Sequence, residues 1–551
     1  MPDHFRRRTF LGGTIGAITG LAGCGSTDDG RENRDTSSDT KTTMGPATSA
    51  DSRVEEEKSL DSQSEVPIHD HSGEDGGGAV LNADRVTASS IEAEKITAGT
   101  IESESLSSHS IASYIVEQRD GKTRCFNPST GEILASAEVG EEDGRVIQTA
   151  LDALEEGGGS VFIRKATYEI HQNNARQDHQ YSDAGLQLKA SHVHILSDSA
   201  TIRFFDHDDG EKTQDDFVIK EADFVRVEGL HLDGNKDVRS GSTSCLNLIY
   251  CDHVTIRDCL IESARRKEES GGGGYGISPF AVNHLTVDNC VIRNNDRHGI
   301  HPGNNSREDQ TNDPDAMMAD YNITNNTFVN NATNPTGAAV DLRDYSKRVL
   351  ISANYFENNR FAVRVKGNHG NVGQIRITDN LFVNEDENEV PSAQVQLAEP
   401  PFDHVDISGN VFELPDAPGQ DSELRHIYAK LDPENRNLEQ NVLRIQNNQF
   451  KGGGKEAVWV FTYPIERLFR TVLIEGNHFQ RIHGAFLNCD GIEYLVIRQN
   501  TFDRSLDVRD DIRLGSETIG SGVFSGNVQI NAKFQSIQDI DVLQLSDNTE
   551  L

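Results

Sequence analysis

Short apolar runs recur along most of the chain in one repeating frame. An apolar–x–apolar strand is followed by Asn five residues after its first apolar position, and by Phe two residues later, as at Ile375, Ile377, Asn380 and Phe382. The same frame occurs at Asn326/Phe328, Asn354/Phe356, Asn410/Phe412, Asn448/Phe450, Asn477/Phe479 and Asn500/Phe502. Short strands at a regular repeat length predict a solenoid.

The spacing and the residue types of the repeat predict its architecture. Successive units begin 23 to 38 residues apart, which suits one turn of a three-sheet β-helix. We expect the Asn residues to take the left-handed backbone of a sharp corner and to bond to one another in a ladder, with each Phe stacked inside. Cys259 and Cys290 occupy the Asn slot in earlier units, where they suit buried packing, although stacking would also bring them within reach of a disulfide.

A helical stripe precedes the repeats. It consists of Val146, Ile147, Ala150, Leu151 and Leu154, and three glycines and an apolar strand follow it. Together with Gln148 and Tyr168, this run resembles the first turn of the pectate-lyase superfamily. The resemblance implies an all-β fold over 143–551: a right-handed, single-stranded parallel β-helix (solenoid) with an N-terminal capping helix.

The segments before residue 143 lack the repeat. Arg7, Arg8 and the apolar run after them match a twin-arginine signal, and Leu21 to Cys24 resembles a lipobox, so residues 1–24 are predicted to be a signal peptide with Cys24 lipidated. Residues 25–66 are acidic and poor in large apolar residues, which predicts a disordered tether. Residues 67–112 carry an apolar residue every five positions and are interpreted as a stalk or adaptor, and 113–142 as a connecting segment. This order predicts an extracellular protein anchored to the outer face of the cytoplasmic membrane.

Charge and cysteine content narrow the function. The chain has 89 Asp and Glu against 52 Lys and Arg, a net charge of −37, which argues against nucleic acid as a partner. A third of the residues are apolar, too few for several membrane spans. Surplus carboxylates favour a salt-loving source, with an ordinary acidic secreted protein as the alternative. No CxxC pair is found, so no metal and no cofactor are predicted; calcium stays an alternative that no motif supports.

Outward positions of stacked strands are where a β-helix can carry chemistry. Aligning one strand per turn by its apolar residues, with Val458 followed by Ala485, gives two outward columns. The first is Ser278, His301, Asp341, Arg364, Gln396, Tyr428, Trp459 and Phe486, and the second is Arg343, Lys366, Lys430, Phe461 and Asn488. Cations that run into aromatic rings suit an acidic, uronate-containing polysaccharide, because carboxylates pair with Arg and Lys and sugar faces stack on rings.

The columns divide into a catalytic and a binding part. His301, Asp341, Arg343, Arg364 and Lys366 contain the cation and the base that β-elimination or C5 epimerisation of a uronate needs, and they are predicted to be catalytic. The residues predicted to bind substrate are Tyr428, Lys430, Trp459 and Phe461. Glycoside hydrolysis needs two facing carboxylates and is disfavoured, since only Asp341 is well placed and Asp344 is less so.

Two local resemblances bear on activity. The run from Tyr275 to Phe280 and the later His298-Gly299-Ile300 resemble a motif of alginate C5-epimerases, with Ser278 and Phe280 where that motif has an acid and a histidine. His298-Gly299 and Arg364-Val365-Lys366 resemble elements of polygalacturonases, without the paired aspartates that precede them. The sequence thus predicts a lyase or C5-epimerase-like enzyme, and leaves open a non-catalytic glycan-binding or surface-structural lipoprotein.

Overall fold

The computed structural model divides the chain into two units, Met1–Ile91 and Glu92–Leu551. It describes residues 112–171, 184–206, 214–267, 272–302, 319–332, 336–343, 346–366, 372–385, 393–398, 402–415, 424–431, 441–462, 469–503, 512–514, 519–530, 543–546 and 548–550, all in the second unit. The predicted signal peptide with Cys24, the tether and the stalk lie outside these residues, apart from Ala112. Within the described residues, no helix has the length and apolar character needed to cross a membrane.

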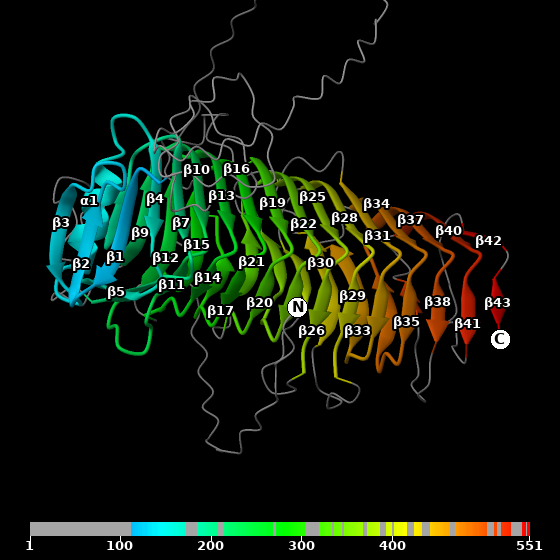
Figure 1. Cartoon of the computed structure of the whole chain (residues 1–551). Helices are drawn as coiled ribbons and strands as arrows, with labels where there is room; N and C mark the ends of the chain where they lie inside the picture. Colours follow the sequence, from blue (N-terminus) through cyan, green and yellow to red (C-terminus); the bar gives the residue numbers. More distant parts are fainter. Residues whose placement is uncertain are drawn as a thin grey trace, which may run out of the picture. The chain divides into compact units, whose positions relative to one another are not determined.

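The described strands stack turn after turn into three sheets, as Figure 1 shows along the colour gradient, so the predicted parallel β-helix is confirmed. The first sheet holds β4 (Gly159–Ile163), β7 (Val193–Ser197), β10 (Asp223–Glu228), β13 (Asp252–Arg257), β16 (Asn283–Asp288), β19 (Ala319–Thr324), β22 (Lys347–Ser352), β25 (Val372–Thr378), β28 (Phe402–Ser408), β31 (Val442–Gln446), β34 (Phe469–Glu475), β37 (Ile492–Arg498), β40 (Ile519–Ser525) and β42 (Leu543–Ser546).

The second sheet follows the first in every turn. It holds β5 (Thr167–His171), β8 (Thr201–Phe205), β11 (His231–Asp233), β14 (Leu260–Glu262), β17 (Val291–Arg293), β20 (Thr327–Val329), β23 (Tyr355–Glu357), β26 (Leu381–Val383), β29 (Val411–Glu413), β32 (Gln449–Lys451), β35 (His478–Gln480), β38 (Thr501–Asp503), β41 (Val528–Ile530) and β43 (Thr549–Glu550).

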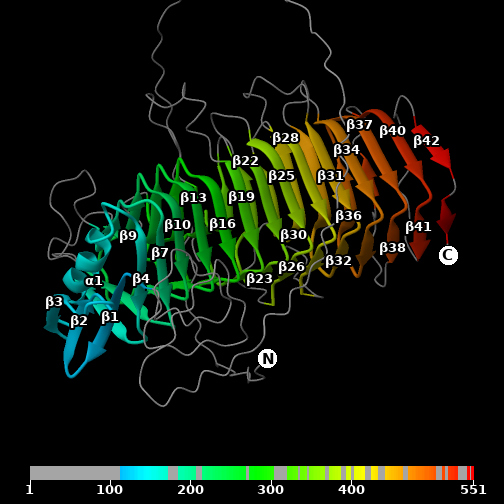
Figure 2. The ribbon, with the colours of Figure 1, turned by 45° about the horizontal axis from the view of Figure 1, so that its top comes forward.

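The third sheet completes the turn and carries the predicted site. It holds β6 (Leu186–Leu188), β9 (Gln214–Lys220), β12 (Thr243–Ile249), β15 (Tyr275–Phe280), β18 (His298–Ile300), β21 (Ala338–Leu342), β24 (Val363–Lys366), β27 (Val395–Ala398), β30 (Arg425–Leu431), β33 (Glu456–Thr462), β36 (Ala485–Cys489) and β39 (Ile512–Leu514). Figure 2 shows the same succession of turns from another side.

The Asn ladder and the Phe stack form as the repeat predicts. Asn380 Nδ2 lies 3.0 Å from Asn410 Oδ1, and the same bond links the other ladder residues from Asn326 to Asn500 and continues to Asn527 and Asn548. The Phe rings stack with centroids 4.6 to 5.0 Å apart. Cys259 and Cys290 are free and buried, as the packing interpretation expects.

The prediction that the ladder Asn residues themselves take the left-handed backbone was wrong. The left-handed residue at this corner is the one before each ladder Asn, and its identity varies: Asn325, Ala353, Asp379, Gly409, Asn447, Gly476 and Gln499. The ladder Asn itself is kept for its side chain. Each amide satisfies a neighbouring Asn and a main-chain carbonyl, such as Ile351 O for Asn380, so buried polar groups at the corner are paired.

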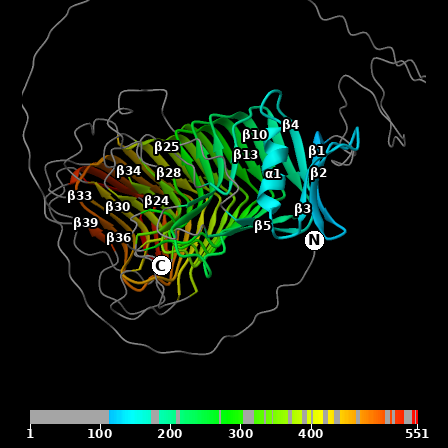
Figure 3. The same cartoon turned by 90° about the vertical axis from the view of Figure 1, so that its left-hand side faces the viewer.

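The N-terminal end of the stack is closed by α1 (Asp143–Asp152) and three strands. Val146, Ile147, Ala150 and Leu151 of α1 belong to the central hydrophobic cluster, so the predicted capping helix packs on the core (Figure 3). The segment 113–142, expected only to connect, forms β1 (Tyr114–Arg119), β2 (Lys122–Phe126) and β3 (Ile133–Glu138). These three pair antiparallel, and β1 pairs parallel with β4, which extends the first sheet.

Candidate functional site

A break in strand alternation shapes the outer face of the third sheet. A Cβ added at Gly276 or Gly299 would meet core residue Ile292 at 3.2 Å, so both glycines face inward, as do Ile277 and Ile300 directly after them. Side chains of a strand normally alternate between its two faces, and two consecutive inward residues shift that alternation by one position. As a result, His298 and His301 lie on the same outer side although they are three residues apart, and their rings stack with centroids 4.4 Å apart.

Asp341 on β21 is the centre of a charged cluster, which we call the Asp341 cluster. Its carboxylate accepts hydrogen bonds from Arg364 Nε (2.6 Å) and Nη2 (3.0 Å), from Arg343 Nε (2.7 Å) and from His301 Nδ1 (3.0 Å). His298 Nε2 lies 3.5 Å from the same carboxylate. These residues come from β18 and the residue after it, from β21 and the residue after it, and from β24, so three turns meet at one point.

The cluster is mostly enclosed. Asp341 and His298 are fully buried, while 6% of Arg364 and 8% of His301 are exposed. The Arg343 side chain is 12% exposed. A ligand in the described arrangement would therefore touch the edges of His301 and Arg343 and would not touch Asp341.

Hydrogen-bond geometry fixes the protonation of the two histidines. The Ala338 N–H donates to His298 Nδ1 at 3.0 Å, which requires a lone pair there and hence a neutral ring with its proton on Nε2. Burial lowers the pKa of His298 and of His301. His301 donates from Nδ1 to Asp341, so the neutral ring carries its lone pair on Nε2.

The carboxyl of Asp341 stays ionised. Burial alone would raise its pKa, but the nearby His298 ring, the hydrogen bond from His301 and the contacts of Arg364 together hold the pKa of Asp341 well below its ordinary value. Two guanidiniums then face one carboxylate and two neutral imidazoles. The cluster carries a local excess of positive charge on a chain whose net charge is −37.

Sequence reasoning missed two neighbours of the cluster. Tyr275 lies in register with His298, and its ring centroid is 4.4 Å from that of His301. Arg297 Nη1 lies 3.0 Å from the Tyr275 hydroxyl. Strict alternation from Ile277 and Ile300 would place Tyr275 and His298 on the core side, so neither entered the outward columns. Gly276 and Gly299 were the signal that alternation is interrupted here. Only a residue without a side chain fits that crowded inward position.

The other predicted site residues lie on the outer face of the third sheet, but each is only partly exposed. Lys366 is half-buried on β24, on the same face as Arg364 two residues before it. Tyr428, Lys430, Trp459 and Phe461 lie side by side on β30 and β33, all half-buried. Contacts within the chain already occupy the tryptophan, since Arg425 lies 4.3 Å from its ring centroid and Phe461 stacks at 4.4 Å.

The end of the first outward column was misaligned. Trp459 pairs with Asn488, and Val458 pairs with Leu487 instead of Ala485. Phe486 is therefore fully buried against Phe479 and Phe502, and it is not an outward residue. The alignment failed because Ala485 and Phe486 precede the inward Leu487, and three apolar residues in a row conceal which of them faces out.

The Asp341 cluster suits an anion better than a cation. His298, His301 and Asp341 could in principle offer three ligand atoms to a metal, all within 4.8 Å of one another. The carboxylate, however, is already engaged by Arg343 and Arg364, whose charges would repel a metal ion. A carboxylate-bearing ligand would instead find guanidinium donors beside a neutral histidine.

Comparisons with known proteins add little beyond the fold. No protein-family model and no curated protein matches the chain. Among solved structures, the A-module of Azotobacter vinelandii mannuronan C-5 epimerase AlgE6 aligns with 75% of this chain and 96% of its own, at 13% identity and a TM-score of 0.35. The E. coli bacteriophage HK620 tailspike protein, in complex with pentasaccharide, covers 77% of this chain and 69% of its own, at 13% identity and a TM-score of 0.43.

A third solved structure is similar to a smaller share of the chain. The tailspike protein gp49 of Pseudomonas phage LKA1 aligns with 60% of this chain and 50% of its own, at 13% identity and a TM-score of 0.38. At these values the similarities carry no argument about activity. The chain is a parallel β-helix by its own strand pairing, and these structures resemble it in arrangement only.

Proposed function

We propose that this protein acts on acidic, uronate-containing polysaccharide at the Asp341 cluster, as a lyase or C5-epimerase-like enzyme. The observation that carries the proposal is the buried Asp341 carboxylate, which holds two guanidiniums and a neutral histidine on the outer face of the third sheet. Such a set supplies both parts that removal of a C5 proton requires, a cation for the uronate carboxylate and a base.

In this proposal each group of the cluster has a role. Arg343 uses Nε for Asp341, so its two Nη nitrogens point donors at the uronate carboxylate and stabilise the charge that develops when C5 loses its proton. His301 accepts that proton on Nε2, while Asp341 stabilises the imidazolium that forms. Arg364 and His298 are positioning residues, because both act through Asp341.

The two reactions differ after the proton has left C5. In elimination, the bond from C4 to the leaving oxygen breaks and a C4–C5 double bond forms. In epimerisation, a proton returns to the opposite face of C5. Tyr275, whose hydroxyl is within 3.0 Å of Arg297 and whose ring lies against His301, is the neighbouring group that would deliver a proton in either case.

The location belongs to the same proposal. The twin-arginine pattern at Arg7 and Arg8 and the lipobox cysteine Cys24 support export and attachment to the outer face of the membrane. The net charge of −37 supports a salt-rich environment, where repulsion between carboxylates is screened. Activity assays therefore belong in high salt.

A second candidate function is binding of the same polymers without turnover. The observation that favours it is the low exposure of the cluster, of which 8% of His301 and 6% of Arg364 are accessible. The half-buried ring surfaces of Tyr428, Trp459 and Phe461 would then hold the chain.

Incubation with acidic polysaccharides in high salt separates the two. A lyase produces the ultraviolet absorbance of an unsaturated uronate, and an epimerase changes the C5 stereochemistry seen by NMR. His301→Gln should abolish either signal, while Arg498→Ala, which removes a surface arginine paired with Glu475 on the first sheet, should leave it unchanged. Polymer binding without either signal would reject the enzyme and leave the binding protein.

A further inference from the structure

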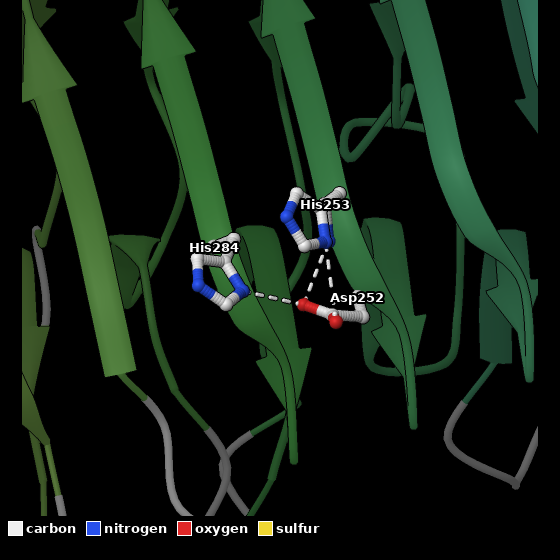
Figure 4. Close-up of side chains that lie close together, drawn as sticks. All are labelled: Asp252, His253 and His284. Carbon is white, nitrogen blue, oxygen red and sulfur yellow. Dashed lines mark hydrogen bonds and ion pairs between the residues drawn. The ribbon is translucent and has the colours of Figure 1, made fainter. Parts of the chain in front are cut away.

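A second group of ionisable side chains lies on the first sheet, and we call it the Asp252 group. Asp252 and His253 begin β13, and His284 lies near the start of β16 in the next turn (Figure 4). His284 Nδ1 is 2.7 Å from Asp252 Oδ1, and His253 Nδ1 is 3.2 Å from Asp252 Oδ2. Two imidazole nitrogens therefore converge on one carboxylate at the surface.

We propose that Asp252, His253 and His284 form a binding site for a divalent transition-metal ion of the Zn²⁺ class. Imidazole nitrogens and a carboxylate are ligands that Zn²⁺ takes in proteins. One ligand atom from each residue can be chosen so that all lie within 4.8 Å of one another. Tetrahedral coordination at the usual bond lengths would place ligand atoms about 3.3 Å apart, so the ligand atoms must move closer and the stacked imidazoles must turn until both nitrogens face the ion.

The side chains have the freedom to make those shifts. The Asp252, His253 and His284 side chains are 41%, 44% and 46% exposed. Among the hydrogen bonds and ion pairs of the described residues, no arginine contacts Asp252. This distinguishes the Asp252 group from the buried Asp341 cluster, whose carboxylate two arginines already neutralise.

The neighbouring turn orients one of the imidazoles. Asp320 Oδ2 lies 3.5 Å from His284 Nε2. Arg348 holds Asp320 in place, because its Nε and Nη2 each donate to the carboxylate at 2.6 Å. His284 Nδ1 lies closer to Asp252 Oδ1, so in the described structure it donates its proton there, and a bound metal ion would replace that proton while Nε2–H faces Asp320. Carboxylate–histidine–metal arrangements of this kind hold ligands in place in known zinc sites.

The backbone beneath these residues is strained in a regular way. His192, Phe224, His253, His284, Asp320 and Arg348 occupy one corner in successive turns, and all have φ between 50° and 62°. The left-handed conformation costs a residue with a side chain roughly 1–2 kcal/mol, which glycine would avoid. The same conformation recurs at the ladder corner, so at this corner it fixes only the direction in which the side chains leave the backbone.

A groove beside the Asp252 group leaves room to complete the coordination. Its volume is about 400 Å³, and Phe224, Arg226, His253, Thr255, His284 and Asp320 are among its lining residues. Rings of Phe224 and His253 stack with centroids 4.6 Å apart, and those of His253 and His284 at 4.2 Å. Water or an oxygen of a bound molecule in the groove would supply the fourth ligand.

Calorimetric titration of the full chain with ZnCl₂ in high salt tests this site. All proteins carry Cys24→Ser, so that this thiol cannot bind metal. We expect one tight site in the parent and at least a tenfold loss of affinity in Asp252→Asn and in His284→Gln. Asp320→Asn should lose about tenfold, as is usual for partners of a ligand.

Two matched variants separate this site from other histidines. His231→Gln removes a histidine that lies 2.8 Å from Glu262 on the second sheet, and His301→Gln removes one from the Asp341 cluster. Both should bind Zn²⁺ as the parent does. Equal titrations of the parent and Asp252→Asn, or a loss that follows His301→Gln, would overturn the proposal. If Asp252→Asn does not fold, His253→Gln replaces it in the same comparison.

Discussion

At the scale of single residues, the Asp341 cluster shows how a buried charge is tolerated. Asp341 is fully buried, and Arg343, Arg364 and His301 all donate to it. A buried carboxylate costs several kcal/mol unless its partners compensate. The partners therefore stabilise the fold in addition to their proposed role, and variants in the cluster must be judged by stability and by activity together.

Replacing Arg364 should show the structural part. Arg364→Ala removes two of the hydrogen bonds to Asp341 and should lower the free energy of unfolding by about 3 kcal/mol. Urea unfolding measures it. Arg498→Ala, which breaks an exposed pair with Glu475, should cost far less. Equal losses in the two variants would mean that Asp341 does not depend on Arg364.

The neutral histidines predict a pH dependence of stability. The pKa of His298 is lowered in the folded chain, so below the ordinary histidine pKa of about 6.5 the unfolded chain binds more protons than the folded chain. Stability should therefore fall as the pH is lowered from 7 to 5, by up to about 1.4 kcal/mol per pH unit for each such histidine.

The variant His298→Gln isolates this contribution. Its stability should fall less steeply than that of the parent over the same pH range. The depressed pKa of Asp341 does not interfere, because its contribution is lost only at a pH below the ordinary aspartate value. Parallel pH profiles for His298→Gln and the parent would contradict a neutral buried His298.

At the scale of the elements, the Asn ladder ties neighbouring turns together. Asn380 donates to Asn410 Oδ1 and Ile351 O, and its own Oδ1 accepts from Asn354. Asn380→Ala should lower the free energy of unfolding by about 3 kcal/mol, since several buried groups lose partners. Asn322→Ala, at an exposed position of β19, is the control and should change little. A small loss in Asn380→Ala would show that the ladder adds little to the backbone pairing and the Phe stack that also join the turns.

Much of the architecture could be predicted from the sequence, because each turn needs the same buried apolar residues and the same paired polar group at its corner. The Asn and Phe slots recur at fixed spacing, and the stripe from Val146 to Leu154 shows a helix that needs one apolar partner surface. The folded state of 113–142 was missed, because three short antiparallel strands carry no repeat. Alternation predicted the outward residues of the Asp341 cluster, and the same rule left out His298, because Gly299 interrupts the alternation.

At the scale of the whole molecule, the account predicts where the protein is found. Cys24→Ser should release it from the membrane into the medium, since the lipidated cysteine is the proposed anchor. Arg7→Lys with Arg8→Lys should stop export, because the twin arginines are the proposed signal. Cell fractionation with immunodetection measures both. Membrane association that stays unchanged in both variants would contradict the proposed location.

The central claim, that the Asp341 cluster recognises a uronate, is tested most directly by a crystal structure of the protein soaked with an oligouronate in high salt. The account predicts a sugar carboxylate within hydrogen-bond distance of Arg343, with C5 of the same sugar facing His301. Soaks of Arg343→Ala should lose this density. An oligouronate bound elsewhere on the β-helix, with the Asp341 cluster untouched, would contradict the account.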